Sequence, residues 1–378
     1  MAGTGKGIAA GTRREREGGE LVMEKRTSKR AAQGVIAAAS ALLLAVALSA
    51  CSTNGSGSQA AGQSASGGAA PEGAAATASS DTLEQGASSE TRDITIHIGY
   101  QKYGTINILK ADGALDRRLA EERNIKIEWT EFPGGPQLLE ALNVGSVDVG
   151  HAGEAPPIFA QAAGAKLVYL AHEPASPRSE GIIVPKDSPL QSVAELKGKT
   201  VVLNKGSNVH YLLVKQLEEN GVAYKDVDVK YLPPADARAA FEKGSVDAWV
   251  IWDPFLAAAE TATGGRVIAN GEGAVSNHEF YLATREFAEK YPDLVEILLE
   301  EADKIDVWAK ANPRELAEKL SPQLGIDVES LELAAGRRAY GVQRIDEELV
   351  QAQQSIADTF YELGLIPDQL DIHDGILK

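Results

Sequence analysis

The sequence has a single cysteine, Cys51, among its 378 residues. No disulfide can therefore form within the chain, and a cysteine-rich metal site is excluded. Long hydrophobic runs are also missing, because the longest, residues 34–48, is shorter than the roughly 20 residues that a membrane-spanning helix needs. The apolar fraction of 44% is that of an ordinary globular protein, and the length leaves room for about two domains.

Basic side chains are scarce in most of the chain. The net charge at pH 7 is −17. Residues 1–50 carry 8 basic and 4 acidic side chains, a net charge of +4, so the remainder carries about −21. Such an acidic body disfavours nucleic acid and an anionic membrane surface as partners. An anion site in this protein must therefore work through local hydrogen-bond donors.

Catalytic signatures are absent from the sequence as well. It has no Gly-x-Gly-x-x-Gly, no phosphate-loop motif, no Gly-x-Ser-x-Gly and no His-Glu-x-x-His. Its six histidines show no metal-ligand spacing. We therefore expect neither an enzyme nor a metal or cofactor site. An enzyme that uses Glu154 and Asp253 as acid and base remains an alternative.

The N-terminal part is typical of a secreted lipoprotein. Basic residues follow Met23, the apolar run 34–48 comes next, and Leu48-Ser49-Ala50-Cys51 resembles a bacterial lipobox. We expect residues 1–50 to be an extension and lipoprotein signal peptide, although a plain signal peptide is the alternative. Residues 51–92 would then be the lipidated Cys51 and a flexible Gly/Ser/Ala linker, which holds the protein to the cell membrane outside the cytoplasm.

From Asp93 onward, strand and helix patterns alternate, which predicts an α/β fold with mostly parallel sheets. Single helices are expected at 106–122 and 209–220, a short one at 192–198, and a mainly helical region at 285–362. Strands are expected at 94–99, 125–132, 147–150, 166–171, 181–185, 200–204, 227–232, 246–251, 266–269 and 280–283.

One unit occurs twice in this alternation. The stretch Ala237 to Pro254 is expected to form a helix, a turn, a strand and a loop, and residues 138–157 follow the same plan. Both copies contain Gly-Ser-Val-Asp, at 145–148 and at 244–247. Two similar lobes around one cleft are more typical of a receptor than of an enzyme.

Three glycine-containing turns precede helices, at residues 134–136, 153–156 and 205–208. A helix start presents free backbone N–H groups and a partial positive charge, so several starts around a cleft can hold an oxyanion. Trp252 offers an aromatic wall and Asp253 a carboxylate, although a core tryptophan beside a capping aspartate fits them equally well. Arg238, at a helix start, could pair with an anion or form a surface ion pair.

Several long motifs resemble the aliphatic sulfonate-binding proteins of ABC importers, over a stretch from about Ile94 to the C-terminus. These motifs are Gly99-Tyr100-Gln101-Lys102, Glu131-Phe132-Pro133-Gly134-Gly135-Pro136-Gln137, residues 140–148, residues 156–165, residues 234–241 and Ala248-Trp249-Val250-Ile251-Trp252-Asp253-Pro254. The resemblance implies the type II periplasmic-binding-protein fold, with two α/β lobes joined by two crossings around a ligand cleft. Lobe I would comprise residues 93–177 plus 279–378, and lobe II residues 178–278.

The resemblance also implies a function, in which a monomeric receptor captures a sulfonate and closes to dock on a permease with a separate ATPase. Related receptors for taurine, nitrate or a thiamine precursor provide the alternative ligands. Glu154 departs from the aspartate that relatives often carry, and a carboxylate there would suit an amino-sulfonate. The residues placed around the ligand are Gln101, Gly135, Gln137, Gly153, Glu154, Ser207, Asn208, Trp252 and Asp253, and the helix-start argument adds Arg238.

Overall fold

The computed structural model describes residues 94–377. The expected signal peptide (1–50), the lipidated Cys51 and the linker (51–92) lie outside the described residues. Within the described range, no helix combines the length and the apolar character needed to cross a membrane. The same range contains no group of three or more side chains placed to hold a metal ion.

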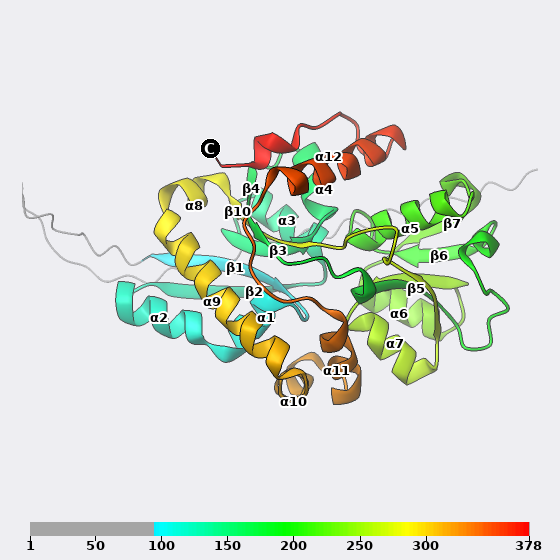
Figure 1. The fold of residues 1–378 in the computed structure, drawn as a ribbon, viewed down its shortest axis with the longest axis horizontal. Coiled ribbons are helices and arrows are strands. Elements are labelled where there is room, and N and C mark those ends of the chain that lie inside the picture. Colours follow the sequence, from blue (N-terminus) through cyan, green and yellow to red (C-terminus); the bar gives the residue numbers. More distant parts are fainter. Residues whose placement is uncertain (1–93, 378) are drawn as a thin grey trace, which may run out of the picture. The chain divides into compact units, whose positions relative to one another are not determined.

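Two five-stranded sheets organise the described chain (Figure 1). The strand order is β2-β1-β3-β10-β4 in the first sheet and β7-β6-β8-β5-β9 in the second. The strands are β1 (Thr95–Gln101), β2 (Lys126–Phe132), β3 (Val149–Gly153), β4 (Leu167–His172), β5 (Glu180–Val184), β6 (Thr200–Leu203), β7 (Asp228–Tyr231), β8 (Ala248–Trp252), β9 (Arg266–Asn270) and β10 (Glu279–Thr284).

The two sheets have equivalent connectivity. In each, one strand runs antiparallel to its neighbours: β10 between β3 and β4, and β5 between β8 and β9. Each of these strands is the first that the chain forms after it leaves the other sheet, so the chain crosses twice between the sheets. The predicted α/β fold with mostly parallel sheets is confirmed, and the antiparallel strands mark where the chain enters each sheet.

Helices cover both sheets and form most of the C-terminal region. They are α1 (Thr105–Asp112), α2 (Ala114–Arg123), α3 (Gly135–Asn143), α4 (Pro156–Ala162), α5 (Asn208–Glu219), α6 (Pro234–Glu242), α7 (Phe255–Thr263), α8 (Arg285–Lys290), α9 (Pro292–Ala311), α10 (Pro313–Leu324), α11 (Val328–Arg337) and α12 (Glu347–Glu362), with short 3-10 turns at Pro177–Ser179, Val193–Leu196, Tyr224–Asp226 and Ile372–Gly375.

The single helix expected at 106–122 is wrong. Gly113 adopts a left-handed conformation with φ of 74°, and its N–H donates to the carbonyl of Leu109, which ends α1. α2 begins at the next residue. Because glycine has no Cβ, it takes this conformation at little cost, and the break lets both Leu109 and Leu115 reach the core.

The repeated unit folds in the same way in both copies, as predicted. Gly145 and Gly244 follow α3 and α6 in the left-handed conformation, with φ of 72° and 68°. The side chains of Asp148 and Asp247 then each accept a backbone N–H from a neighbouring strand of their own sheet, that of His97 in β1 and that of Thr200 in β6, at 2.8 Å in both cases. The aspartate therefore fixes the position of β3 beside β1 in one sheet and of β8 beside β6 in the other.

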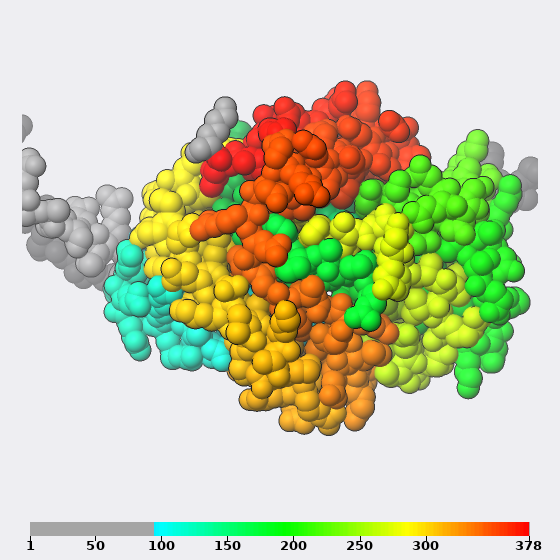
Figure 2. Space-filling view, viewed as in Figure 1, coloured from blue at the N-terminus to red at the C-terminus, as the bar shows by residue number. Residues whose placement is uncertain are grey.

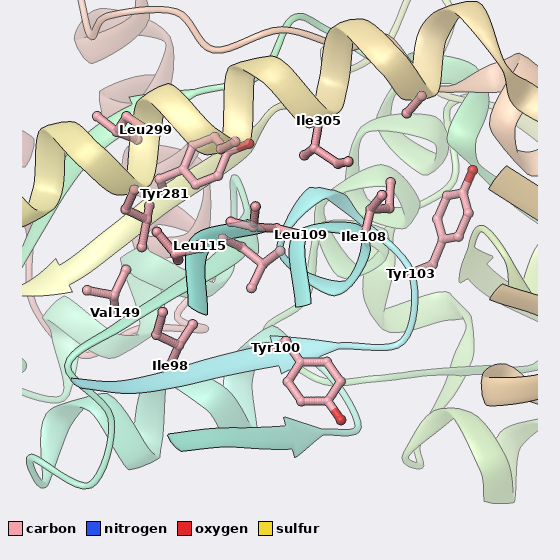
Figure 3. Close-up of a cluster of buried hydrophobic side chains, with 14 of the residues drawn as sticks. Ile98, Tyr100, Tyr103, Ile108, Leu109, Leu115, Val149, Tyr281, Leu299 and Ile305 are labelled. Carbon is pink, nitrogen blue, oxygen red and sulfur yellow. The ribbon is translucent and has the colours of Figure 1, made fainter. Parts of the chain in front are cut away.

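One hydrophobic core lies between the first sheet and helices α1, α2 and α9 (Figure 3). Ile98 of β1 and Val149 of β3 meet Leu109 of α1 from below, and Leu299 and Ile305 of α9 cover it from above. All five side chains are buried. Burial of one such side chain is worth roughly 1.5–3 kcal/mol, so this core fixes β1 and β3, whose ends reach the site described below.

A second core contains residues from both sheets and is closed by α12. Phe360 of α12 is fully buried; its ring centroid lies 4.8 Å from that of Phe159 on α4 and 5.8 Å from that of Tyr211 on α5. In the space-filling view the C-terminal segment, coloured orange to red, lies over green segments of the chain (Figure 2). The C-terminal helix thus joins helices that belong to different sheets.

Candidate functional site

A small cavity lies where the two sheets meet. Its lining residues are Gln101, Gly135, Gly153, Ser207, Asn208, Trp252 and Glu279. The first three and Glu279 belong to the first sheet and its helix α3, and the others to the second sheet and its helix α5. A water-sized probe can occupy only about 10 Å³ of the cavity. Six of the ten residues predicted to bind a ligand are therefore brought together in one cavity.

The ends of parallel strands and the starts of helices form this cavity. Gln101, Gly153 and Trp252 are the last residues of β1, β3 and β8, while Gly135 and Asn208 are the first residues of α3 and α5. Ligand sites of open α/β sheets occupy this carboxyl edge. α4 also starts near it, but its first two residues are prolines without N–H groups, so α3 and α5 are the better donors.

The polar side chains of the lining are engaged within the protein. The Gln101 amide donates to the carbonyl of His151 at 2.9 Å, and the Ser207 hydroxyl donates to the carbonyl of Asn204 at 2.6 Å. The Asn208 amide donates to the side chain of Asn277. These bonds hold the loops in place, so the helix N-termini remain the main source of donors for an anion.

Gln137 lies one turn into α3, outside the lining. Its amide nitrogen is 3.5 Å from Oδ1 of Asn204, the limit of a hydrogen bond. Gln137 Oε1 and Asn204 Nδ2 are buried, and neither has a hydrogen-bond partner among the described residues. An acceptor and a donor are therefore left unpaired between the two sheets, beside the cavity.

Glycine is required at two close contacts beside the cavity, one between the two halves and one within the first half. A Cβ on Gly153 would lie 1.9 Å from Oδ1 of Asn208, and one on Gly135 would lie 2.8 Å from Cγ of Pro156. Real Cβ atoms essentially never approach another heavy atom within 3.0 Å. The glycines predicted at 135 and 153 therefore allow a close contact between the helix starts and the strand ends.

Glu154 and Asp253 follow the strand ends but do not line the cavity. Glu154 is buried and accepts the N–H of His278 at 3.1 Å; burial raises its pKa to about 7, against the lowering effect of that bond. Asp253 accepts the N–H of Ala257 at 3.0 Å, and burial raises its pKa to about 7 although the Arg337 guanidinium opposes this. Burial therefore favours the neutral form of both carboxyls.

Trp252 and Arg238 have different surroundings. Trp252 is partly exposed, lines the cavity and packs edge-to-face on Phe255, with ring centroids 6.3 Å apart. Arg238 lies on α6, and its Nε donates to Glu242 at 2.7 Å in an ion pair one helical turn long. Arg238 is not among the residues that line the cavity, and it forms the surface ion pair that was its alternative interpretation.

Two glutamates at the site were not predicted. Glu279 begins β10 and pairs in register with Gly153, and Glu180 begins β5 and pairs with Trp252. Glu180 is fully buried, and burial raises its pKa well above the ordinary value. In the sequence, each glutamate directly precedes an apolar strand, and this position is the feature by which it could have been found.

Two adjacent arginines after α11 were also missed. Arg337 forms ion pairs with Asp253 and Glu260 from the second sheet's part of the chain. Arg338, whose side chain is only 9% exposed, pairs with Glu173, which follows β4 of the first sheet. The C-terminal segment therefore carries charged contacts to both halves, beside the two crossings.

The geometry of the cavity agrees with the proteins to which this chain is similar. Residues 90–321 match the NMT1-like family. An aliphatic sulfonates-binding protein of Escherichia coli (strain K12) is 41% identical over 292 residues, which are 76% of this chain and 90% of that protein. The chain belongs to the NMT1-like family.

Solved structures of similar proteins lead to the same result. The alkanesulfonate-binding protein SsuA from Xanthomonas axonopodis pv. citri, bound to MOPS, matches with a TM-score of 0.71 at 38% identity, over 75% of this chain and 98% of that one. The periplasmic aliphatic sulphonate binding protein SsuA from Escherichia coli matches with a TM-score of 0.68 at 41% identity, over 76% and 93%. These structures confirm the type II periplasmic-binding-protein fold and the resemblance.

The similar proteins also provide information about catalysis and about location in the cell. Those above are binding proteins, and the Escherichia coli SsuA is periplasmic. A desulfurization enzyme, DszB, shares the fold with a TM-score of 0.55 at 16% identity. This fold therefore occurs in enzymes as well, but at a similarity that shows the fold alone.

Proposed function

We propose that this chain is an extracytoplasmic receptor that captures aliphatic sulfonates for an ABC importer, and that it is not an enzyme. One observation carries the proposal: the starts of α3 and α5, from different sheets, line one cavity at Gly135 and Asn208. The 41% identity to an aliphatic sulfonates-binding protein supports the choice of ligand.

The sulfonate would be held by neutral donors. The cavity lining contains no lysine or arginine, so the N–H groups of two helix starts, each with a partial positive charge, would bind the sulfonate oxygens. Such bonds to an anion are stronger than neutral ones and keep their value after water is excluded. The alkyl chain would lie against Trp252.

A water-sized probe can occupy only about 10 Å³ of the cavity, so the two halves lie close together around it. Residues 93–177 plus 279–378 would form one lobe, and residues 178–278 the other. The contacts of Gly153 with Asn208 and of Gln137 with Asn204 would then be those of a closed cleft.

Closure of the lobes would allow the transporter to recognise a receptor that has bound its ligand. A ligand bound by both halves favours the closed form by its differential affinity, and a permease with a separate ATPase subunit would recognise that form. The receptor would act as a monomer, held to the membrane through lipidated Cys51 and the linker at 51–92. Because no step of this function changes the ligand, the receptor needs no reacting group.

The test is titration calorimetry after unfolding and refolding, which removes carried-over ligand. Ethanesulfonate, octanesulfonate, taurine, nitrate and sulfate are the ligands, and Trp252→Ala is the variant. Alkanesulfonates should bind best, and Trp252→Ala should weaken them by about tenfold or more, as expected for loss of an apolar wall. Preference for nitrate or sulfate, or no heat with any ligand, would refute the proposal, and any product formed on incubation would restore the enzyme alternative.

A further inference from the structure

Two buried glutamates lie directly behind the cavity, one from each sheet. Glu154 follows Gly153, the last residue of β3, and Glu180 begins β5 and pairs in register with Trp252. Gly153 and Trp252 both line the cavity. The exposed fractions of Glu154 and Glu180 are 2% and 0%, and the two carboxyls interact electrostatically. Because like charges repel strongly where water is excluded, this pair is an unfavourable place for two negative charges.

Three of the four carboxyl oxygens of this pair have no hydrogen-bond partner among the described residues. These oxygens are Glu180 Oε1, Glu180 Oε2 and Glu154 Oε1, and all three are buried. The fourth, Glu154 Oε2, accepts the backbone N–H of His278 at 3.1 Å. The amide of Asn208, the nearest lining residue of α5, donates to Asn277. A buried carboxylate without donors costs far more free energy than a buried neutral carboxyl.

The surroundings of Glu180 favour its neutral form. Burial raises its pKa well above the ordinary value, the charges of Glu154 and Glu279 raise it further, and the Asn208 amide opposes this rise only in part. Burial also raises the pKa of Glu154 to about 7, although the N–H of His278 opposes the rise. When two acids share one site, one of them keeps its proton to a higher pH than usual. Glu180 is the acid that keeps it in this pair.

A tyrosine and a third glutamate also face this pair. Burial and the charge of Glu154 raise the pKa of Tyr211 on α5 to about 12, so this phenol is neutral. Glu279 of β10 lies 3.3 Å from His151 Nδ1 and interacts with the Arg338 guanidinium. These two bases therefore lie at Glu279 rather than at the buried pair, and a proton is the cation that can neutralise the pair itself.

Closure of the two halves would create this environment. Glu154 belongs to the part of the chain proposed as one lobe and Glu180 to the other, so opening would return water to both carboxyls and separate them. In the closed form Glu180 lies beside Asn208, at the helix start where the sulfonate would bind, and a carboxylate there would repel the ligand.

We propose that the receptor takes up one proton from solvent with each sulfonate that it binds, and that Glu180, beside Glu154, holds this proton. This inference rests on the proposed sulfonate-binding function of the same cavity. Because the bound form holds one proton more than the free form, affinity is highest at low pH and falls as the pH rises. One proton corresponds to a change of about tenfold in Kd for each pH unit.

The experiment uses the full protein in buffers that contain no sulfonate group. Calorimetry gives the Kd for ethanesulfonate at pH 7.5 and 8.5, and a glass electrode in weakly buffered solution gives the proton uptake at pH 8.0. The unaltered protein should take up about one proton for each ethanesulfonate, and its Kd should be about tenfold higher at pH 8.5 than at pH 7.5. Glu180→Gln should take up about 0.3 proton or fewer, with a change in Kd below about twofold, because its amide resembles the neutral carboxyl but binds no proton.

Two further variants complete the test. Glu180→Met also removes the titrating group and should give the same result as Glu180→Gln, because an apolar group of similar shape replaces unpaired polar atoms at little cost. Glu286→Gln, the same change of charge on exposed α8, is the control and should keep the proton uptake and the pH dependence of the unaltered protein. Thermal melting shows which variants are folded.

The outcomes separate this inference from the proposed function. Binding of ethanesulfonate to the unaltered protein without proton uptake overturns the inference while the receptor function stands. Uptake of about one proton by a folded Glu180→Gln or Glu180→Met variant overturns it as well, since another group would then hold the proton. Failure of ethanesulfonate to bind the unaltered protein overturns the proposed function and this inference with it.

Discussion

Adding one methyl group at Gly153 should impair ligand capture while leaving the fold intact. The three heavy atoms nearest to a Cβ built there all belong to the side chain of Asn208, at 1.9–2.4 Å. Gly153 ends β3 of the first sheet, and Asn208 starts α5 of the second. Gly153→Ala therefore obstructs the contact between the two halves rather than the core of either.

The size of the effect follows from the contact. Because real Cβ atoms essentially never come within 3.0 Å, the amide must retreat by at least the difference of 1.1 Å. That movement breaks the bond from Asn208 to Asn277, or keeps the two halves apart. Loss of a buried hydrogen bond costs about 1–3 kcal/mol, so the Kd for a sulfonate should rise by about 5- to 150-fold.

The assay is calorimetric titration with ethanesulfonate, together with the thermal midpoint of each protein. Gly336→Ala is the matched control, because a Cβ there meets no atom within 4 Å and the residue lies inside α11. This control should bind as the unaltered protein does and gain up to about 1 kcal/mol of stability from the better helix former. If Gly153→Ala binds ethanesulfonate within about twofold of the unaltered protein, the contact between β3 and α5 does not govern binding.

Three other predictions follow from the contacts and titrations of the chain. Arg238→Ala should change the sulfonate Kd by less than about twofold and stability by less than about 1 kcal/mol, because Arg238 forms an exposed pair with Glu242. Calorimetric titration and thermal melting would measure the two effects. Phe360→Ala should lower the free energy of unfolding by about 3–5 kcal/mol in urea titration, because its ring is fully buried between helices of both halves. Burial raises the pKa of Glu154 and Asp253 to about 7, above their unfolded values. Near neutral pH the folded chain therefore keeps protons that the unfolded chain has released. The free energy of unfolding should fall by about 1 kcal/mol per group from pH 6.5 to 8, which thermal melts would measure.

Each of these has an outcome that would contradict it. A tenfold higher Kd for Arg238→Ala would mean that Arg238 takes part in ligand binding. A loss below about 1 kcal/mol for Phe360→Ala would mean that α12 does not hold the two halves together. Stability that rises between pH 6.5 and 8 would mean that Glu154 and Asp253 are ionised in the folded protein. The pH range of the test begins at 6.5 because His210 has the opposite effect at lower pH. Burial lowers the pKa of His210 to about 4, so this residue makes stability rise with pH until the pH reaches the unfolded pKa of 6.5.

The candidate site could be predicted in part because its framework is local in the sequence. Glycine turns before helices and the repeated Gly-Ser-Val-Asp unit depend on backbone conformation and on residues close along the chain. Gly135, Gly153, Ser207 and Asn208 were found in this way and line the cavity. The break at Gly113 was missed, although it too is local, because the apolar spacing continues on both sides of it.

Long-range partners could not be predicted in the same way. Arg338 pairs with Glu173, 165 residues away, and Gln353 of α12 donates to the carbonyl of Glu154, 199 residues away. Arg238 was placed at the ligand because a helix start was expected there, but α6 begins four residues earlier, at Pro234, and one helical turn brings Arg238 to Glu242. No local pattern states which of several charged residues meet after two sheets have formed.

By itself, the sequence determined the order of strands and helices, the unit that occurs twice, the glycine turns and the resemblance to sulfonate receptors. Each of these depends on short-range backbone preferences or on residues read in order. Only the tertiary structure decided that β5 and β10 enter each sheet antiparallel, that Glu279 faces the cavity while Glu154 and Asp253 are buried behind it, and that α12 joins both halves. Burial and charge pairing are properties of the packed molecule, because they depend on which distant segments exclude water from each group.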